Sequence, residues 1–266
     1  MRPSWPLGKF YTYTQKVTKP QLSIIEEGKI ACIRIDSFYI NGKNRNEFFK
    51  TIDDFLQQTE NYKHLIIDIT RNNGGYDSTW RYLVSRLINE DIKEQRYALY
   101  KKTKYNKYHL NMCLLSKRIK ELNIKELPNY KKIKTKRFNK ACVETSIIYK
   151  NPLDSYNYNQ EKKIWLLVGK GTFSASDRFA GFCKSSEFAT VVGERASGCG
   201  MNIFAPMPLA LPNSGALFLY EFTYALNADG SCNAIIGTEP DIYNKEGKTA
   251  METCLEEIKK YDRQHK

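Results

Sequence analysis

The fold is decided by residues 164–177, which read IWLLVGKGTFSASD. Five apolar residues with glycines behind them predict a buried strand that ends in a turn. Apolar residues then recur at helical spacing as far as Cys183, which predicts a helix with Ser174 or Ser176 as its N-cap. A serine on such a bend lies beside the backbone N–H groups of the helix start, where an oxyanion would form. The alternative interpretation is that both serines only cap the helix.

A second strand and turn of the same kind lies earlier in the chain. Residues 64–75 read HLIIDITRNNGG, an apolar run that passes into polar turn residues and a glycine pair. Glycine adopts positive φ readily and lets the backbone approach a ligand closely. Trp80, Leu83 and Leu87 follow at helical spacing and indicate an amphipathic helix. Two strand–turn–helix units, each with a turn rich in N–H donors, could face each other across one cleft.

The turn at the glycine pair resembles a motif of the C-terminal processing, or tail-specific, serine peptidases. This family includes the tricorn core and the retinoid-binding repeats, and its pattern is Asp-x-Arg-x-Asn-x-Gly-Gly. The pattern is matched by Asp68, Asn72, Gly74 and Gly75, with Thr70 where arginine is usual.

Three further motifs follow in the order that the family has them. Residues 174–177 (SASD) are similar to the family's nucleophile motif Ser-Ala-Ser-Glu/Asp. Residues 193–198 (GERASG) resemble its Gly-Glu-x-Thr-x-Gly stretch, and residues 237–241 (GTEPD) match its Gly-x-x-Pro-Asp motif. Each motif is weak alone. Together the four cover roughly residues 28–245 and are a strong signal for the fold.

The resemblance implies a ClpP/crotonase-like α/β fold, which is a spiral of β-β-α units. We expect one core domain over residues 28–266, preceded by an arm of residues 1–27 and carrying a basic insertion at about residues 97–163. The residue pattern predicts one hairpin-like strand over residues 217–225 and an amphipathic helix over residues 249–261. Neither the first residues nor the insertion is long enough for the family's peptide-binding PDZ domain.

The resemblance also implies a serine peptidase that hydrolyses peptide bonds through an acyl-enzyme at Ser174. The oxyanion hole would come from the backbone N–H of Gly74 or Gly75 and from that of Ala175. None of these donors depends on a side chain, so all of them would survive sequence drift.

Two acidic residues are further candidates for the site. Asp177 matches the family's acidic residue three positions after the serine, which in one branch orients a lysine base. An acid placed in the first helical turn by the helix dipole is an equally good interpretation. Glu239 could be the acid of the charge relay in the tricorn-like branch, or an ordinary loop carboxylate, which we favour.

The proton acceptor that a serine nucleophile needs is not evident. The lysine branch has its base twenty-five positions after the serine, where this chain has Cys199. The tricorn-like branch uses an upstream histidine in an Asp-Gly-His-Thr context, and nothing like it precedes Lys29. His64, His109 and His265 are better explained as surface or structural residues, and among them His109 alone could reach the cleft.

Two classes of function therefore remain open. The chain is a peptidase acting on a peptide or the C-terminus of an unfolded protein, with its base supplied by a segment missing from this chain or by a partner. Alternatively, it is a catalytically impaired pseudo-peptidase that acts as a peptide- or lipid-binding scaffold. Neither class involves a cofactor or a metal ion, and an oligomer is left open.

The charge of the chain bears on its partners. The 266 residues are 41% hydrophobic, enough for a full core in one domain. A net charge of +13 favours anionic surfaces, but no nucleic-acid motif accompanies it. Residues 101–140 hold many lysines and arginines against only Glu121 and Glu126. We interpret this stretch as a solvated face, with binding of an anionic polymer or a cleft lid as alternatives.

The cysteines and the first residues bear on the compartment. The seven cysteines are odd in number and widely spaced, without a C-x-x-C pair, which argues against disulfides or zinc and favours a reducing compartment. Prolines stand where a secretory signal has its apolar core, and no run approaches transmembrane length. We expect a cytoplasmic protein, or an exported one if the start of the chain has been trimmed.

Overall fold

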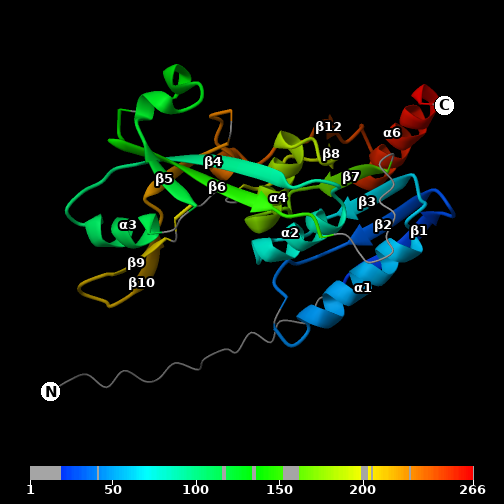
Figure 1. Ribbon diagram of the computed structural model, residues 1–266, viewed down its shortest axis with the longest axis horizontal. Helices are drawn as coiled ribbons and strands as arrows, with labels where there is room; N and C mark the ends of the chain where they lie inside the picture. The colour runs from blue at the N-terminus through cyan, green and yellow to red at the C-terminus, as the bar shows by residue number, and fades with distance from the viewer. Residues whose placement is uncertain are drawn as a thin grey trace.

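The computed structural model describes residues 19–40, 42–115, 118–133, 136–151, 162–198, 203–204, 206–227 and 229–265. The chain folds around a six-stranded sheet of order β1-β2-β3-β7-β8-β12 (Figure 1). β1 is antiparallel to β2, and the other neighbours are parallel. Its strands are β1 (Gln21–Glu26), β2 (Ile30–Arg34), β3 (His64–Asp68), β7 (Lys163–Val168), β8 (Thr190–Gly193) and β12 (Ile242–Tyr243).

Helices cover both faces of this sheet, which explains why its central strands are apolar without interruption. Successive side chains of a strand point to opposite faces. Leu65 and Ile67 of β3 belong to the large core cluster on one face, whereas Ile66 belongs to the cluster on the other. The first cluster includes residues of α1 (Arg45–Gln58), α2 (Asp77–Arg86) and α4 (Ala175–Ser185), and the second those of α6 (Ala250–Gln264).

A second lobe extends from this core on two long strands (Figure 1). β4 and β6 pair over nine residues each, and the four-stranded antiparallel sheet has the order β11-β4-β6-β5. α3 and a two-stranded hairpin, β9 with β10, complete the lobe. Its elements are β4 (Ile92–Tyr100), α3 (Lys107–Leu114), β5 (Ile119–Leu122), η1 (Ile124–Glu126), η2 (Tyr130–Lys132), β6 (Lys140–Ile148), β9 (Met207–Ala210), β10 (Leu217–Tyr220) and β11 (Thr223–Leu226).

The lobe draws on two separate parts of the chain. β5 and β6 lie within the basic insertion expected at residues 97–163, and most of β4 precedes residue 97. β11 comes from much later in the sequence and pairs with β4. The short helix α5 (Asn233–Ile236) leads from β11 back to the core.

The α/β fold predicted from the sequence is confirmed. The helix predicted after Ser174 is present as α4, and the helix predicted over residues 249–261 is present as α6. Thr249 caps α6 in a reciprocal capping box with Glu252, as a helix start at residue 249 requires. The single strand predicted over residues 217–225 is wrong. Thr223 N–H and its hydroxyl both donate to the carboxylate of Glu221, and this local turn divides the segment into β10 and β11, which belong to different sheets.

Three other expectations concern the surroundings of the core. Residues 1–18 of the expected arm, and Cys199, lie outside the described residues. The six cysteines in the described part of the chain form no disulfide with one another. No helix within the described residues is long and apolar enough to cross a membrane.

Candidate active site

Ser174 lies on the turn between β7 and α4, in an unusual backbone conformation. Its φ and ψ are 58° and −122°, so a non-glycine residue is held in a region that L-residues rarely adopt. Its N–H donates to the carbonyl of Gly198 at 2.9 Å, and its carbonyl accepts from Arg178 N–H at 3.0 Å. Although Ser174 occupies the N-cap position, its hydroxyl makes no capping bond and has no hydrogen-bond partner within the described residues. The capping interpretation therefore does not describe this side chain.

The glycine turn touches the serine turn directly. Gly74 and Gly75 have φ values of 101° and 136°, which are accessible to glycine at little cost. A Cβ on Gly74 would lie 2.8 Å from the Cβ of Ser174 and 3.0 Å from the backbone N of Ala175. The two turns that the sequence pairs are thus in contact at the carboxyl ends of neighbouring strands β3 and β7.

Asn72 fastens the two turns together. The side chain is fully buried; its amide donates to Ile35 O at 2.9 Å and its Oδ1 accepts from Gly74 N–H at 2.8 Å. Its carbonyl accepts from Phe173 N–H at 3.1 Å and from the hydroxyl of Ser176. The Asn of the glycine motif and the second serine of the nucleophile motif therefore hold the backbone, and neither is exposed to a ligand.

The three candidate oxyanion donors differ in their bonding. The N–H of Gly74 is engaged by Asn72. The N–H groups of Gly75 and Ala175 have no acceptor within the described part of the chain. Ala175 is the first residue of α4, where the helix leaves its N–H groups without intrahelical partners and favours negative charge.

The two acidic candidates have other partners. Asp177 is buried, and its carboxylate accepts from Thr238 N–H at 2.8 Å while its carbonyl accepts from the Thr238 hydroxyl at 3.3 Å. It thus attaches residues 237–241 to α4. Glu239 forms an ion pair with Arg195 at the surface, with half of its side chain exposed. Neither carboxylate is hydrogen-bonded to Ser174.

The histidines have structural surroundings. His64 lies at the amino end of β3, where its Nε2 is 2.8 Å from Asp262 Oδ1 and its Nδ1 accepts from Trp165 Nε1 at 3.3 Å. Burial lowers the pKa of His64 despite the nearby Asp262 carboxylate. His109 packs edge-on against Phe222 in the second lobe, and His265 stacks on Tyr261. The described residues contain no cluster of His, Cys, Asp and Glu that could hold a metal ion.

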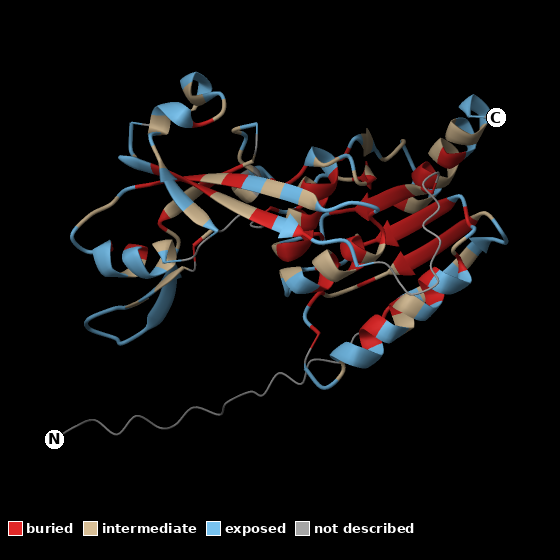
Figure 2. Ribbon diagram, in the orientation of Figure 1, coloured by how far each residue is buried: buried red, intermediate tan, exposed pale blue. Residues whose placement is uncertain are grey.

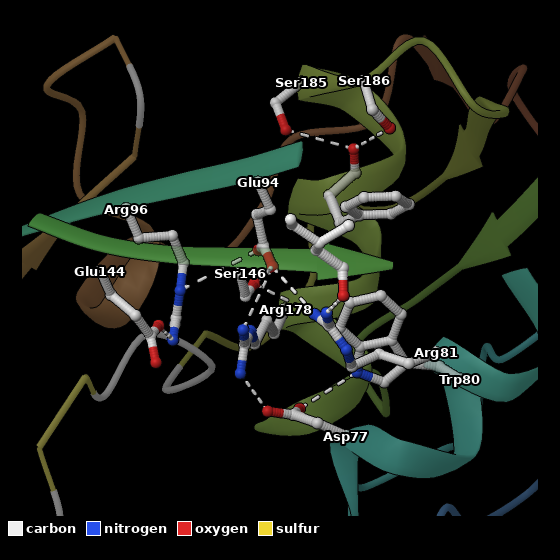
Figure 3. Close-up of polar contacts among 12 residues, drawn as sticks. Asp77, Trp80, Arg81, Glu94, Arg96, Glu144, Ser146, Arg178, Ser185 and Ser186 are labelled. Atoms are coloured by element: carbon white, nitrogen blue, oxygen red, sulfur yellow. Dashed lines mark hydrogen bonds and ion pairs between the residues drawn. The ribbon is translucent and has the colours of Figure 1, made fainter. Parts of the chain in front are cut away.

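A network of ion pairs joins the serine helix to the second lobe (Figure 3). Arg178, one turn after Ser174, pairs with Asp77 at the start of α2 and, at 3.3 Å, with Glu94 of β4. Arg81 also reaches Glu94, at 3.1 Å, and Arg96 lies between Glu94 and Glu144. Burial alone would raise the pKa of Glu94, but the three guanidinium groups outweigh it and lower that pKa.

Sequence reasoning missed this network. Its members come from α2, α4, β4 and β6 and share no motif. The one available signal is the pair Glu94 and Arg96, which stand two apart, with Gln95 between them, on a strand that continues into Ala98 and Leu99. Opposite charges two apart on a strand share one face, but the sequence does not say what that face meets.

The comparison with family models settles the lineage. The model of peptidase family S41 matches residues 29–244, which is most of the chain. The chain belongs to peptidase family S41. The resemblance drawn from the four motifs is therefore confirmed, and with it membership of a family of serine peptidases, which are hydrolases that carry out proteolysis.

Solved structures agree on the fold of this S41 chain. A candidate peptidase from Parabacteroides merdae is 17% identical with a TM-score of 0.60, covering 92% of this chain and 66% of its own. The photosystem II D1 C-terminal processing protease is 15% identical with a TM-score of 0.51, covering 91% and 52%. Mature CPAF in complex with lactacystin is 16% identical with a TM-score of 0.55, covering 87% and 50%.

This S41 chain spans between half and two thirds of the length of those structures. A search of curated proteins by sequence found no match.

Proposed function

We propose that this S41 chain carries the nucleophile and the oxyanion hole of a serine peptidase. The observation that carries the proposal is the conformation of Ser174, which is held at positive φ at the start of a helix, with its hydroxyl free of capping and its Cβ against Gly74. A strained nucleophile turn of this kind is common at functional sites, because the strain keeps the side chain available to a substrate.

In the proposed reaction Ser174 Oγ attacks the carbonyl carbon of a peptide bond and loses its proton to a base. The negative charge that develops on the carbonyl oxygen is stabilised by the N–H groups of Gly75 and Ala175. The leaving amine takes a proton from the base. Water then attacks the acyl-enzyme and gives a proton to the base, and Ser174 Oγ leaves and takes that proton, which releases the carboxylic acid product. Each such oxyanion donor is worth about 10²–10³ in turnover.

The base is the unassigned part of this proposal. Ser174 has no basic partner within the described residues, and Cys199, at the lysine position of one branch, lies outside them. General-base assistance is worth about 10²–10⁴ in rate. We therefore expect slow turnover unless the proton acceptor comes from a segment or a partner outside the described part of the chain. Asp177 and Glu239 are assigned to holding the loops around the site.

The substrate we propose is an extended peptide or the C-terminus of an unfolded protein. Support comes from the name of one structural neighbour, a C-terminal processing protease. The whole of that protein is longer than this chain, so substrate choice here rests on the shared core alone.

A second candidate function is a peptide- or lipid-binding scaffold that has lost turnover. It is favoured by one specific feature, the cysteine at position 199 where one branch of the family has its lysine base. A thiol is a weak base and accepts a proton only as the thiolate.

Hydrolysis of an unstructured peptide by matched variants separates the two functions. We expect wild-type hydrolysis to be lost in Ser174→Ala and kept in Ser186→Ala, which removes a serine from the other end of α4. Hydrolysis seen only in Cys199→Lys means an intact site that lacks its proton acceptor. Peptide binding without hydrolysis in any variant supports the scaffold. Hydrolysis that persists in Ser174→Ala contradicts the proposal.

A further inference from the structure

The outer side of α3 is apolar although it faces solvent. Tyr105, Tyr108, Met112 and Leu115 are 81%, 82%, 69% and 75% exposed. Tyr108 and Met112 lie four apart on one side of the helix, with Tyr105 just before its N-cap and Leu115 at its C-cap. Leu110, on the opposite side, is fully buried. α3 therefore carries an apolar stripe on each side, and only the inner one is covered by the described residues.

The hairpin of β9 and β10 is apolar and exposed as well. Leu217 and Leu219 are 79% and 70% exposed, and Phe218 and Tyr220 are 43% and 48% exposed. β10 pairs with β9 alone. In a chain with 27% charged residues, residues 196–220 contain no charged residue. An exposed hairpin without charge is costly for solubility, so its composition indicates a surface that becomes covered.

The helix and the hairpin lie on the same face of the second lobe. Leu110 of α3 and Met207 of β9 pack into one cluster around Ala98, Tyr100 and Phe222. The opposite face of the same sheet carries a different cluster, with η1 and η2 packed against it. Figures 1 and 2 show α3 beside the hairpin, with exposed residues along both. We call these exposed residues the docking face: Tyr105, Tyr108, Met112, Leu115, Leu217 and Leu219.

The charge around the docking face is strongly positive. Residues 101–140, which contribute to both faces of the lobe, hold fourteen lysines and arginines and two glutamates. Four of these lysines, at positions 101, 102, 104 and 107, immediately precede or begin α3. None of the four forms an ion pair with an acid in the described part of the chain. Lys104 lies 5.1 Å from the ring centre of Tyr105.

We propose that the docking face binds the surface of an anionic lipid membrane. Leucine, methionine and aromatic side chains enter the boundary between headgroups and acyl chains, and lysines beside them pair with anionic headgroups. A second copy of this chain fits less well, because a two-fold contact through the docking face would bring two sets of these lysines together. The inference does not depend on the peptidase proposal, since binding requires neither Ser174 nor a base.

Co-sedimentation with lipid vesicles tests this inference. We expect the chain to bind vesicles of equal parts phosphatidylserine and phosphatidylcholine, and to bind less well to pure phosphatidylcholine or in high salt. Leu217→Ser with Leu219→Ser should weaken binding by more than about tenfold, since two buried leucines are lost. Lys104→Gln with Lys107→Gln should weaken it by about thirtyfold. All of these side chains are exposed, so the variants should fold, which circular dichroism checks.

A matched control removes the same charge elsewhere in the lobe. Lys131→Gln with Lys132→Gln alters η2, on the opposite face of the sheet, and should leave most of the binding intact. Equal loss in this control would overturn the assignment of the surface, because binding would follow total charge alone. Absence of binding to the anionic vesicles would overturn the proposal. So would light scattering that shows a dimer dispersed by the leucine variant without any binding to vesicles.

Discussion

The core sheet and the second lobe of this S41 chain differ in which side chains they bury and which they expose. At the carboxyl edge of the core sheet, Asn72, Ser176 and Asp177 are buried. Their side chains form hydrogen bonds with backbone groups and hold the turns around Ser174 in place. In the second lobe, apolar side chains of α3 and β10 are exposed beside lysines 101, 102, 104 and 107, which form no ion pair within the described residues. Figure 2 shows buried residues along the core strands and exposed residues along α3 and the hairpin of β9 and β10.

The difference shows that a catalytic site and a docking surface are recognised by different features of a sequence and structure. A site made of backbone N–H groups and one hydroxyl requires a fixed backbone conformation. Such a site is therefore recognised by buried polar residues and glycines around it. A docking surface requires no fixed backbone conformation beyond the fold itself. It is therefore recognised by its amino-acid composition and by the exposure of its apolar side chains.

The largest effect is expected at the joint between the two regions. Arg178→Met removes the guanidinium shared by Asp77 and Glu94 and leaves these carboxylates partly uncompensated. Breaking a buried ion pair from one side costs about 3–5 kcal/mol. Urea unfolding should show a loss of this size. Arg195→Met is the matched control, because its pair with Glu239 is exposed and exposed pairs contribute little. If Arg178→Met lowers the free energy of unfolding no more than Arg195→Met does, the buried network does not stabilise the fold.

A smaller effect is expected where two glycines share a positive φ but not the space around it. A Cβ on Gly75 (φ 136°) would meet the backbone of Phe38 and Tyr39, whereas one on Gly215 (φ 69°), in the hairpin loop, would meet nothing within 4 Å. We expect Gly75→Ala to lower the free energy of unfolding by about 3 kcal/mol and Gly215→Ala by about 1 kcal/mol. If both variants lose the same amount, the core turn is no tighter than the hairpin.

The smallest effect concerns the amino end of the core sheet. Burial lowers the pKa of His64 below its ordinary value of 6.5, so the unfolded chain binds the proton more tightly. The stability is fully present above about pH 6.5 and is lost as the pH falls through the folded pKa. Unfolding free energies across this range should fall in wild type and fall less in His64→Gln. His265→Gln, which removes an exposed ring from the end of α6, controls for the loss of an imidazole. A steeper acid loss in His64→Gln would reverse the sign of this account.

Much of the core could be predicted from the sequence, for a physical reason. The central residues of β3 and β7 are buried on both faces and apolar, and the turns that follow the two strands carry glycines where they come into contact. The positions of Ser174 and the glycine pair follow from that pattern. The sequence does not decide between the two roles of Asp177, because a first-turn acid looks the same whether it orients a base or only complements the helix dipole. In the structure its carboxylate accepts from Thr238 N–H.

The second lobe was harder to predict, because its order depends on pairing between distant segments. β11 joins β4 across more than a hundred residues, and Glu221 ends β10 through a turn that hydrophobic alternation does not reveal. The ion network has the same origin: Arg178 and Glu94 meet only once α4 and β4 are in place. The base of the proposed reaction stays a prediction, since Cys199 lies outside the described residues.

Labelling with a fluorophosphonate probe tests most directly whether Ser174 and the facing amides form a reactive site. The probe reacts with an activated serine and needs the oxyanion hole but no peptide substrate. We predict that mass spectrometry locates the label on Ser174 in the wild type, or in Cys199→Lys, where we expect labelling to be faster than in the wild type. It should remain in Ser186→Ala and disappear in Ser174→Ala. A label that persists in Ser174→Ala, or none on Ser174 in both wild type and Cys199→Lys, would contradict the account.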